Sequence, residues 1–349
     1  MIRARLLLPV ALGLLAAPIA TAQETAERSE LSWTFTEGQE LYYGYTWRLE
    51  QTQEVPGVLP PTPSLYQITY TLTEKVTGVA DGVATVQAEI TSIKVDLQLG
   101  MMMGARMAYD SSKPDDGVNP LRPFRHVIGA GFGFKLNAQG QVSDVTGADS
   151  ILEQLNSKAG PEVATMGPMG GQLLGLLGVV FSASSLESSL EIVNEVLPEG
   201  ALAQGESFET PVDMELPTMG RMTFTTRNTH MGTEKGKVTL EGAPTGEIKL
   251  EKLTDGDGDE DPVGAGARDM GRSMAEGQEV KRRDAKRTSV FSTRHHRLES
   301  STIVMEIDSE GPPPPEVKMM LGPDNKDAQM KQSAVLTLTY QRNQTAGAQ

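Results

Sequence analysis

The feature that most constrains the fold is a two-residue alternation of apolar and polar side chains, which recurs along most of the chain. It is clearest at 41–50, where the odd positions are apolar or aromatic and most even positions are polar. Similar alternation returns at 66–72, 132–136, 208–216 and 336–340. A β-strand sends successive side chains to opposite faces, so the pattern predicts strands with one buried and one solvated face. We therefore expect a β-rich, antiparallel fold.

One predicted strand contains a change of phase. Its apolar residues occupy even positions from Val86 to Ile90 and odd positions from Ile93 to Leu99. A strand can turn both sets toward one core only if it absorbs an extra residue, which predicts a β-bulge or sharp bend near Thr91 and Ser92. Long strands that bend are typical of curved sheets, so we expect a half-barrel or an open barrel.

Helices are expected between residues 148 and 197. Ser150 and Glu153 have the spacing of a capping box, and Ile151, Leu152 and Leu155 form an apolar stripe after Ser150. A second helix is predicted at 184–197, because its apolar residues have helical spacing: Leu186, Leu190, Val193 and Leu197. The Gly- and Met-rich segment 166–183 is interpreted as a buried helix or a lid. The predicted fold class is α+β with β dominant: a strongly curved antiparallel sheet with two or three helices packed across it.

The first 22 residues have the pattern of a secretory signal peptide. Arg3 and Arg5 precede a short apolar run, and Ala20-Thr21-Ala22 ends it. The run is short for a membrane span, so we expect cleavage before Gln23, no transmembrane span afterwards, and an extracytoplasmic location in the periplasm, at the cell surface or in the medium. An uncleaved N-terminal anchor is the alternative.

Composition excludes several classes of partner and chemistry. The chain has 31 Lys and Arg against 46 Asp and Glu, a net charge of −15, which argues against nucleic acid as a partner and against general adhesion to anionic lipid head groups. It contains no cysteine, so neither a disulfide framework nor a lipid-modified cysteine is available. Stability must therefore come from a packed core.

The rest of the chain is expected to form a single β-rich domain, residues 31–349, after a polar lead-in at 23–30. Two segments are interpreted as loops: the Pro-rich stretch 55–64 and a flexible charged insertion at 251–287. The insertion has an acidic block, then a basic block, and no apolar period. Further strands are predicted around 288–307 and 333–342.

The acidic block begins like a calcium-binding loop. Asp255, Asp257 and Asp259 match the first three ligand positions, but Glu260 stands where glycine is required and Gly266 stands where a bidentate Glu is required. These three residues are the only metal candidates, and a solvated acidic linker is the competing interpretation.

Catalytic and cofactor motifs are missing from the sequence. It has no HExxH, no GxSxG and no nucleophilic cysteine, and the glycines at 129–133 continue into a strand rather than a phosphate-binding helix. Two of the four histidines, His126 and His230, stand alone. The adjacent His295 and His296 fall in a predicted strand, where their side chains would point to opposite faces. The basic run from Lys281 to Arg297 is interpreted as a solvated face or a docking patch for an anionic surface polymer. We expect no catalytic residue and no cofactor.

Three stretches together resemble a family of secreted bacterial proteins classed only as a domain of unknown function. They are LSWTFTEGQELYYGYTW near the start, FGFKLNAQGQVSDVTGADSILEQL in the centre and VFSTRHHRLESSTIVMEI near the end. This chain departs from the pattern at Phe291-Ser292, where the family usually has Phe-Asp. The resemblance implies one continuous β-rich domain, and it implies no activity and no catalytic residues.

These observations favour a non-enzymatic binding or envelope-associated protein outside the cytoplasm. One form of that function is an apolar ligand held between a curved sheet and its helices, by analogy with periplasmic carriers of acyl chains. The alternatives are a structural component of the cell envelope without a ligand and an unrecognised hydrolase.

Overall fold

The computed structural model describes residues 28–98, 106–114, 117, 119–164, 166, 170, 180–181, 183–194, 197–216, 220–251, 279–313, 317–318, 325 and 328–343. The strands of the main sheet are β2 (Glu40–Val55), β3 (Leu59–Ala80), β4 (Val83–Gln98), β5 (Arg106–Asp110), β6 (Gly131–Leu136), β7 (Val142–Thr146), β9 (Ser207–Leu216), β10 (Gly220–Glu234), β11 (Lys237–Glu251), β12 (Glu279–Ser292), β13 (Arg297–Gly311) and β14 (Met330–Arg342). The other elements are the short pair β1 (Arg28–Ser29) and β8 (Leu202–Ala203), the 3-10 helix η1 (Arg122–Val127), and the α-helices α2 (Ala148–Ala164) and α4 (Ala183–Asn194).

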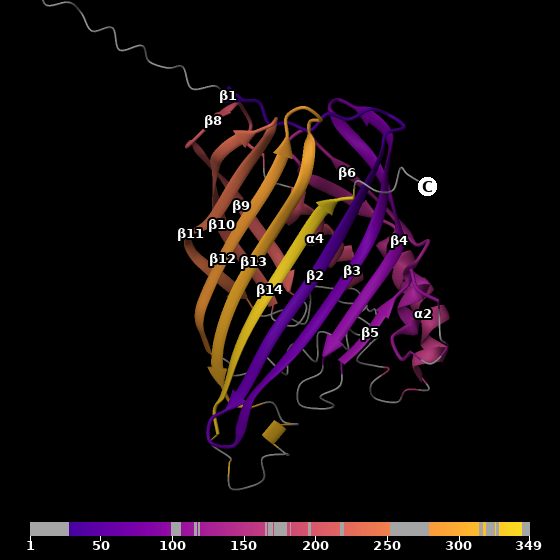
Figure 1. Cartoon of the computed structure of the whole chain (residues 1–349), viewed down its shortest axis with the longest axis vertical. Coiled ribbons are helices and arrows are strands. Elements are labelled where there is room, and N and C mark those ends of the chain that lie inside the picture. The colour runs from indigo at the N-terminus through magenta and orange to yellow at the C-terminus, as the bar shows by residue number, and fades with distance from the viewer. Residues whose placement is uncertain are drawn as a thin grey trace, which may run out of the picture.

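The main sheet has twelve antiparallel strands, in the order β7-β6-β4-β3-β2-β14-β13-β12-β11-β10-β9 with β5 beside β4. Strands β2 and β14 pair at its centre although they lie near opposite ends of the chain (Figure 1). From β2 the chain runs outward to the edge strand β7, passes through α2 and α4, and resumes at the opposite edge, β9. It then returns strand by strand to β14. The sheet is open at β7 and β9, and the predicted β-dominant, antiparallel class is confirmed.

The predicted alternation produces a buried face, which we call the inner face because it also packs against α4. On β2, Leu41, Tyr43, Tyr45 and Leu49 are buried, whereas Trp47 is only partly buried. The predicted bulge is also confirmed. Thr71 pairs with Ser92 and Leu72 with Ile90, so Thr91 is the extra residue. The bulge allows both apolar sets of β4 to be buried.

Helix α2 has the predicted apolar stripe and starts where the predicted helical segment starts, but Ser150 does not cap it. Ile151, Leu152 and Leu155 are buried. The helix begins at Ala148, so Ser150 lies inside the first turn and its hydroxyl donates to the carbonyl of Gly147 at 2.6 Å. The capping-box prediction is therefore wrong.

Helix α4 confirms the second predicted helix, although it ends at Asn194. Leu186, Leu190 and Val193 are buried on one side. The helix contacts both edge strands of the sheet, β7 and β9, as well as β13 and β14 near its centre. In Figure 1 it lies behind β14 and β2. Most of the segment 166–183, interpreted above as a third helix or a lid, lies outside the described residues.

A buried arginine holds the C-terminal end of α4 against the sheet. Arg287 of β12 donates from Nη2 to the carbonyl of Ile192 at 2.7 Å. The last carbonyls of a helix have no partner within the helix and carry partial negative charge, so a cation stabilises them. Gly242 of β11 pairs with Arg287, and a Cβ at 242 would lie 3.0 Å from the Arg287 Cβ.

Two predicted loops are partly wrong. Residues 279–287, assigned to the charged insertion, belong to β12, where Ala285 and Arg287 are buried. The inward positions of β12 carry small or polar residues, so the sequence shows no apolar alternation there. The remaining residues of the insertion after Glu251, 252–278, lie outside the described residues. The Pro-rich stretch 55–64 is mostly strand, with a turn only at 56–58, because residues 59–64 pair with β2 alone and an edge tolerates proline.

Residues 31–35 also alternate apolar and polar side chains, which would favour a strand, but they form an irregular segment across one end of the sheet. The backbone N–H of Trp33 donates to Ala138 and that of Thr34 to His296, so the segment joins two turns while Trp33 stays buried. The predicted strand at 288–307 is interrupted by a turn at 293–296, which contains His295 and His296.

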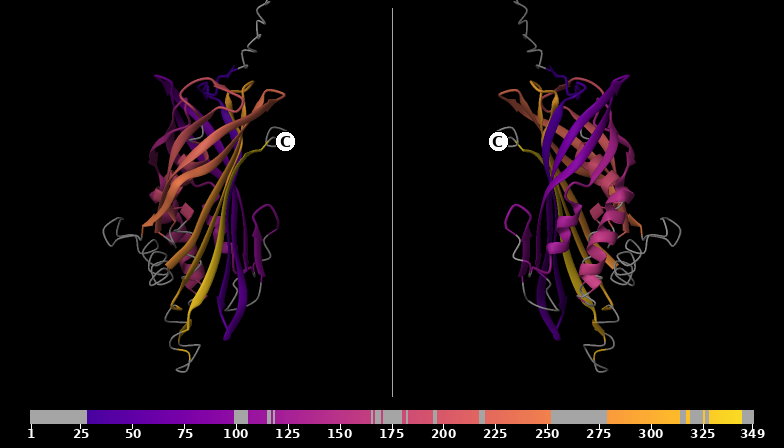
Figure 2. Two further views of the ribbon diagram at one scale, coloured as in Figure 1. Left: turned by 90° about the vertical axis from the view of Figure 1, so that its left-hand side faces the viewer. Right: turned by 90° about the vertical axis from the view of Figure 1, so that its right-hand side faces the viewer.

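The polar lead-in at 23–30 differs from the prediction at its C-terminal end. Arg28 and Ser29 of the polar lead-in form β1 and pair with β8. The predicted signal peptide, 1–22, lies outside the described residues. Within the described part of the chain, no helix has the length and apolar character needed to cross a membrane. Figure 2 shows both helices from the two sides of the molecule.

Candidate functional site

The structure does not gather the residues that the sequence singled out. Asp255, Asp257 and Asp259 lie outside the described residues. Among the described residues no group of His, Asp and Glu is arranged to hold a metal ion. His126 Nε2 lies 3.1 Å from Glu162 on α2, and the buried His230 lies 3.1 Å from the hydroxyl of Thr233.

A group of tyrosines lies on the inner face where β2, β3 and β14 meet. Register places Tyr45 opposite Tyr340 on one side and opposite Tyr70 on the other. Tyr43 stacks on Tyr340 with ring centroids 4.2 Å apart, and Tyr45 stacks on Tyr70 at 5.0 Å. All four are buried, so this end of the core is built from aromatic rings that carry hydroxyl groups.

Glu74 of β3 is a carboxyl group buried beside these tyrosines. It shares the inward parity of Leu72 and is 3% exposed. The hydroxyl of Tyr340 donates to its Oε1 at 2.9 Å. Burial raises the pKa of Glu74 to about 7, because the ionised form loses its hydration, while the Tyr340 hydrogen bond opposes the rise.

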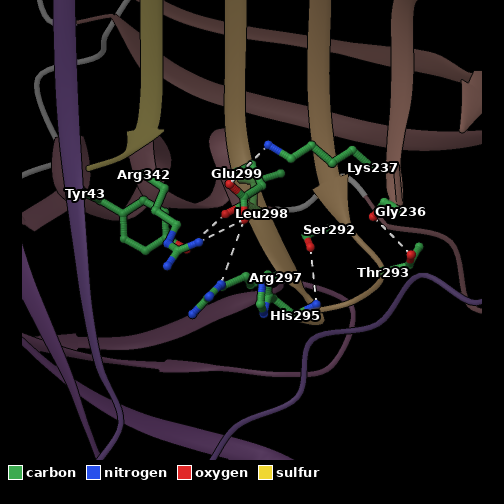
Figure 3. A network of polar contacts seen from close by, with 10 residues as sticks. All are labelled: Tyr43, Gly236, Lys237, Ser292, Thr293, His295, Arg297, Leu298, Glu299 and Arg342. Atoms are coloured by element: carbon green, nitrogen blue, oxygen red, sulfur yellow. Dashed lines mark hydrogen bonds and ion pairs between the residues drawn. The ribbon is translucent and has the colours of Figure 1, made fainter. Parts of the chain in front are cut away.

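Next to the tyrosines, a second bulge places Glu299 among basic residues. Val290 pairs with Ser300 and Phe291 with Leu298, so Glu299 is the extra residue of β13. The hydroxyl of Tyr43 donates to the carbonyl of Leu298 at 3.0 Å and fixes the strand beside the bulge (Figure 3). The Glu299 side chain is 10% exposed.

Three cations surround the Glu299 carboxylate. Arg342 Nη1 donates to Oε1 at 3.1 Å, Lys237 Nζ lies 3.7 Å from Oε2, and Arg297 Nε lies 4.0 Å from Oε1 (Figure 3). They come from β14, β11 and β13. Burial and the neighbouring Arg342 lower the pKa of Arg297, whereas Tyr43 and Glu299 oppose this. We call Lys237, Arg297, Glu299 and Arg342 the arginine cluster.

The turn between β12 and β13 borders the arginine cluster. The His295 N–H donates to the Ser292 hydroxyl at 3.2 Å, and the Thr293 hydroxyl donates to the carbonyl of Gly236 at 3.0 Å. Desolvation lowers the pKa of His295, and Arg297, Arg294 and Arg342 lower it further. The low pKa is further sign of a positive local potential.

A cavity of about 370 Å³ lies away from this site, beside β4 and β5. Four of its lining residues are charged, and all four are paired: Asp96 with Arg106 outside the lining, and Asp110 with Lys94 at 3.5 Å and Lys113 at 4.0 Å. It lacks the apolar character expected of a site for an apolar ligand.

Glu74 and the arginine cluster form the candidate site, and neither was singled out from the sequence. A carboxyl group with a pKa near neutrality can exchange a proton, and a partly buried group of cations can hold an anion. Glu74 could have been found, since it lies two residues after Leu72 and shares the parity of the apolar residues in the predicted strand 66–72. The arginine cluster depends on register between distant strands, which the sequence does not reveal.

Comparison with known proteins identifies a family but no activity. Residues 81–259 match the sequence model described as "Family of unknown function (DUF6263)". No curated protein matches.

The solved structures that resemble this chain include three with a sequence identity of 10% or less. A chain from a study of lipid–protein interactions in lipovitellin has 10% identity and a TM-score of 0.39, covering 89% of this chain. This chain spans only 25% of that one. DynF from the dynemicin biosynthesis pathway of Micromonospora chersina has 8% identity and a TM-score of 0.19, with coverage of 95% and 96%. A DUF1329 family protein from Desulfovibrio piger has 7% identity and a TM-score of 0.15, with coverage of 88% and 87%. These scores are too low to support an argument about function.

We predict that Glu74 makes stability fall as pH rises from about 4.5 to about 7. In that window the unfolded chain releases the proton that folded Glu74 retains, so ionisation favours unfolding. Glu74→Gln cannot titrate. Across the window the free energy of unfolding of Glu74→Gln should rise relative to that of wild type by on the order of 3 kcal/mol. Urea unfolding at several pH values measures the difference.

The matched control is Glu89→Gln, which removes an exposed carboxyl from the neighbouring strand β4. It should keep the wild-type pH dependence. If Glu74→Gln and Glu89→Gln follow the same curve, the folded pKa of Glu74 is not raised.

Proposed function

We propose that this chain, which belongs to the family of unknown function DUF6263, is a non-enzymatic binding or envelope-associated protein that works outside the cytoplasm. The observation that carries the proposal is the position of α4, a helix with an apolar side that contacts both edges of the sheet. We call the apolar boundary where α4 packs against the inner face the seam.

The contacts of α4 support a sheet that bends around the helix. Eleven strands on the path from β7 to β9 would span about 48 Å if the sheet were flat, at about 4.8 Å per strand. Helix α4 has twelve residues and is about 18 Å long. A helix of that length reaches both edges only if the edges approach each other, as they do in a half-barrel.

The seam has the composition of a site for an apolar ligand. Leu186, Leu190 and Val193 of α4 and the buried aromatic and aliphatic residues of the inner face form one continuous apolar cluster. A short helix is displaced more easily than a sheet, because fewer hydrogen bonds and contacts hold it. An apolar molecule would lie between α4 and the inner face.

A non-catalytic role is supported by the surroundings of the ionisable groups. His126 contacts Glu162, His230 contacts Thr233, and Glu74 bonds to Tyr340, so these groups are engaged in holding the fold. The alternative of a structural envelope component is favoured by the same continuous cluster, since a solid core would also require it. A hydrolase is the third candidate.

The proposed location depends on residues 1–22. Their basic start, apolar run and small-residue end support cleavage by a secretory signal peptidase. N-terminal sequencing of the protein from the extracytoplasmic fraction should begin at Gln23. A chain that retains residues before Ala20 would contradict this location.

The binding proposal predicts that folded protein takes up the neutral fluorescent probe Nile red with saturable stoichiometry. Burial raises the pKa of the Tyr45 phenol on the inner face, and the side chain of Ser189 on α4 opposes the rise, so Ser189 lies next to Tyr45. Ser189→Trp should place an indole in the seam and exclude the probe, so the affinity for the probe should fall about tenfold or more. Fluorescence titration measures the affinity.

Ser188→Trp is the matched control, because it adds the same side chain about 100° around the helix, away from Leu186 and Leu190. It should bind the probe like wild type. If the probe binds only on unfolding, the helices cover a solid core and the structural alternative takes precedence.

A further inference from the structure

Arg297 has unused hydrogen-bonding capacity inside the arginine cluster. Its side chain is 14% exposed, and its Nε is buried without a hydrogen-bond partner. Its nearest carboxylate oxygen, on Glu299, lies 4.0 Å away, beyond hydrogen-bond distance. Among the described residues no acceptor receives a hydrogen bond from this guanidinium. Leaving the buried Nε–H of a guanidinium without an acceptor is costly.

The charges around Arg297 do not balance. Arg342 and Lys237 already share the Glu299 carboxylate, so one negative group faces three positive groups. The adjoining turn adds Arg294, and desolvation together with Arg297, Arg294 and Arg342 lowers the pKa of His295 in that turn. This positive region stands out in a chain whose net charge is −15.

The guanidinium of Arg297 points away from the one carboxylate of the arginine cluster (Figure 3). Figure 3 shows its guanidinium extending away from Glu299, whereas Arg342 and Lys237 point toward that carboxylate. The side chains of Arg342 and Lys237 are 25% and 49% exposed, so the cluster opens to solvent. A guanidinium in such a place binds carboxylate or phosphate oxygens through two parallel hydrogen bonds.

We propose that Arg297, with Arg342 and Lys237 beside it, binds an anionic group, a phosphate or a carboxylate, at this end of the sheet. The anion supplies the acceptors that Arg297 lacks and offsets the excess positive charge. This site does not require the proposed apolar seam. The anion can be a free ion or the head group of an amphiphile, two sources with the same recognition chemistry.

The test is isothermal titration of the full mature chain with two probes, inorganic phosphate and dodecyl phosphate. Wild type should bind at least one of them with saturation. Arg297→Gln should weaken that binding about tenfold or more, the expected loss of a charge-assisted pair. Because Arg297→Gln also removes repulsion from Arg342, it should fold, and its circular dichroism and unfolding midpoint verify this.

Arg294→Gln is the matched control, since it removes the same charge from an exposed position three residues away. It should change the affinity by less than about threefold, as for a screened surface charge. Arg297→Lys keeps the charge but loses the paired donors, and it should bind at an intermediate strength.

The outcomes separate the sources and the proposals. Equal affinity for both probes assigns the site to a free anion, and stronger binding of dodecyl phosphate assigns it to an amphiphile head group. Phosphate binding without Nile red uptake retains the anion site and removes the apolar seam. The proposal is overturned if neither probe saturates, or if Arg297→Gln and Arg294→Gln weaken binding equally.

Discussion

The contact of α4 with both edges of the main sheet is the interaction on which the rest of the structure depends. The chain leaves the centre at β2, reaches one edge at β7 and resumes at the other edge at β9, so the helical segment must connect the two. Leu186, Leu190 and Val193 supply apolar contacts, and Arg287 secures the helix C-terminus through the Ile192 carbonyl. The two halves of the sheet, β2 to β7 and β9 to β14, are thereby joined twice, through β2–β14 pairing and through α4.

The polar groups of the core gather at one end of the inner face. Tyr340 links the buried Glu74 to the stack with Tyr43, and Tyr43 in turn bonds to the strand that carries Glu299. A continuous path therefore runs from a carboxyl group with a pKa near 7 to a partly exposed group of cations. Buried polar groups are costly unless paired, and here they pair with one another along this path.

Local patterns in the sequence predicted the local structure well. Alternation located most strands, and the phase change located the bulge at Thr91, because both depend on residues adjacent in the chain. Residues 279–287 of β12 were missed, since its inward positions carry the small Ala285 and the charged Arg287 instead of large apolar side chains. The proximity of Lys237, Arg297 and Arg342 follows from pairing between distant strands, which a single sequence does not encode in any local period. Glu74 shows the intermediate case, because its position was readable but its partner Tyr340 was not.

Hydrogen exchange at the two sheet edges in Leu190→Asp tests the central role of α4 most directly. The substitution buries an unpaired carboxylate between the helix and the sheet, whereas Ser188→Asp places the same group on the opposite side of α4. If α4 holds both edges, the backbone amides of β7 and β9 lose protection together in Leu190→Asp and keep it in Ser188→Asp. Wild-type protection at both edges in Leu190→Asp, or equal loss in the two variants, would contradict the account.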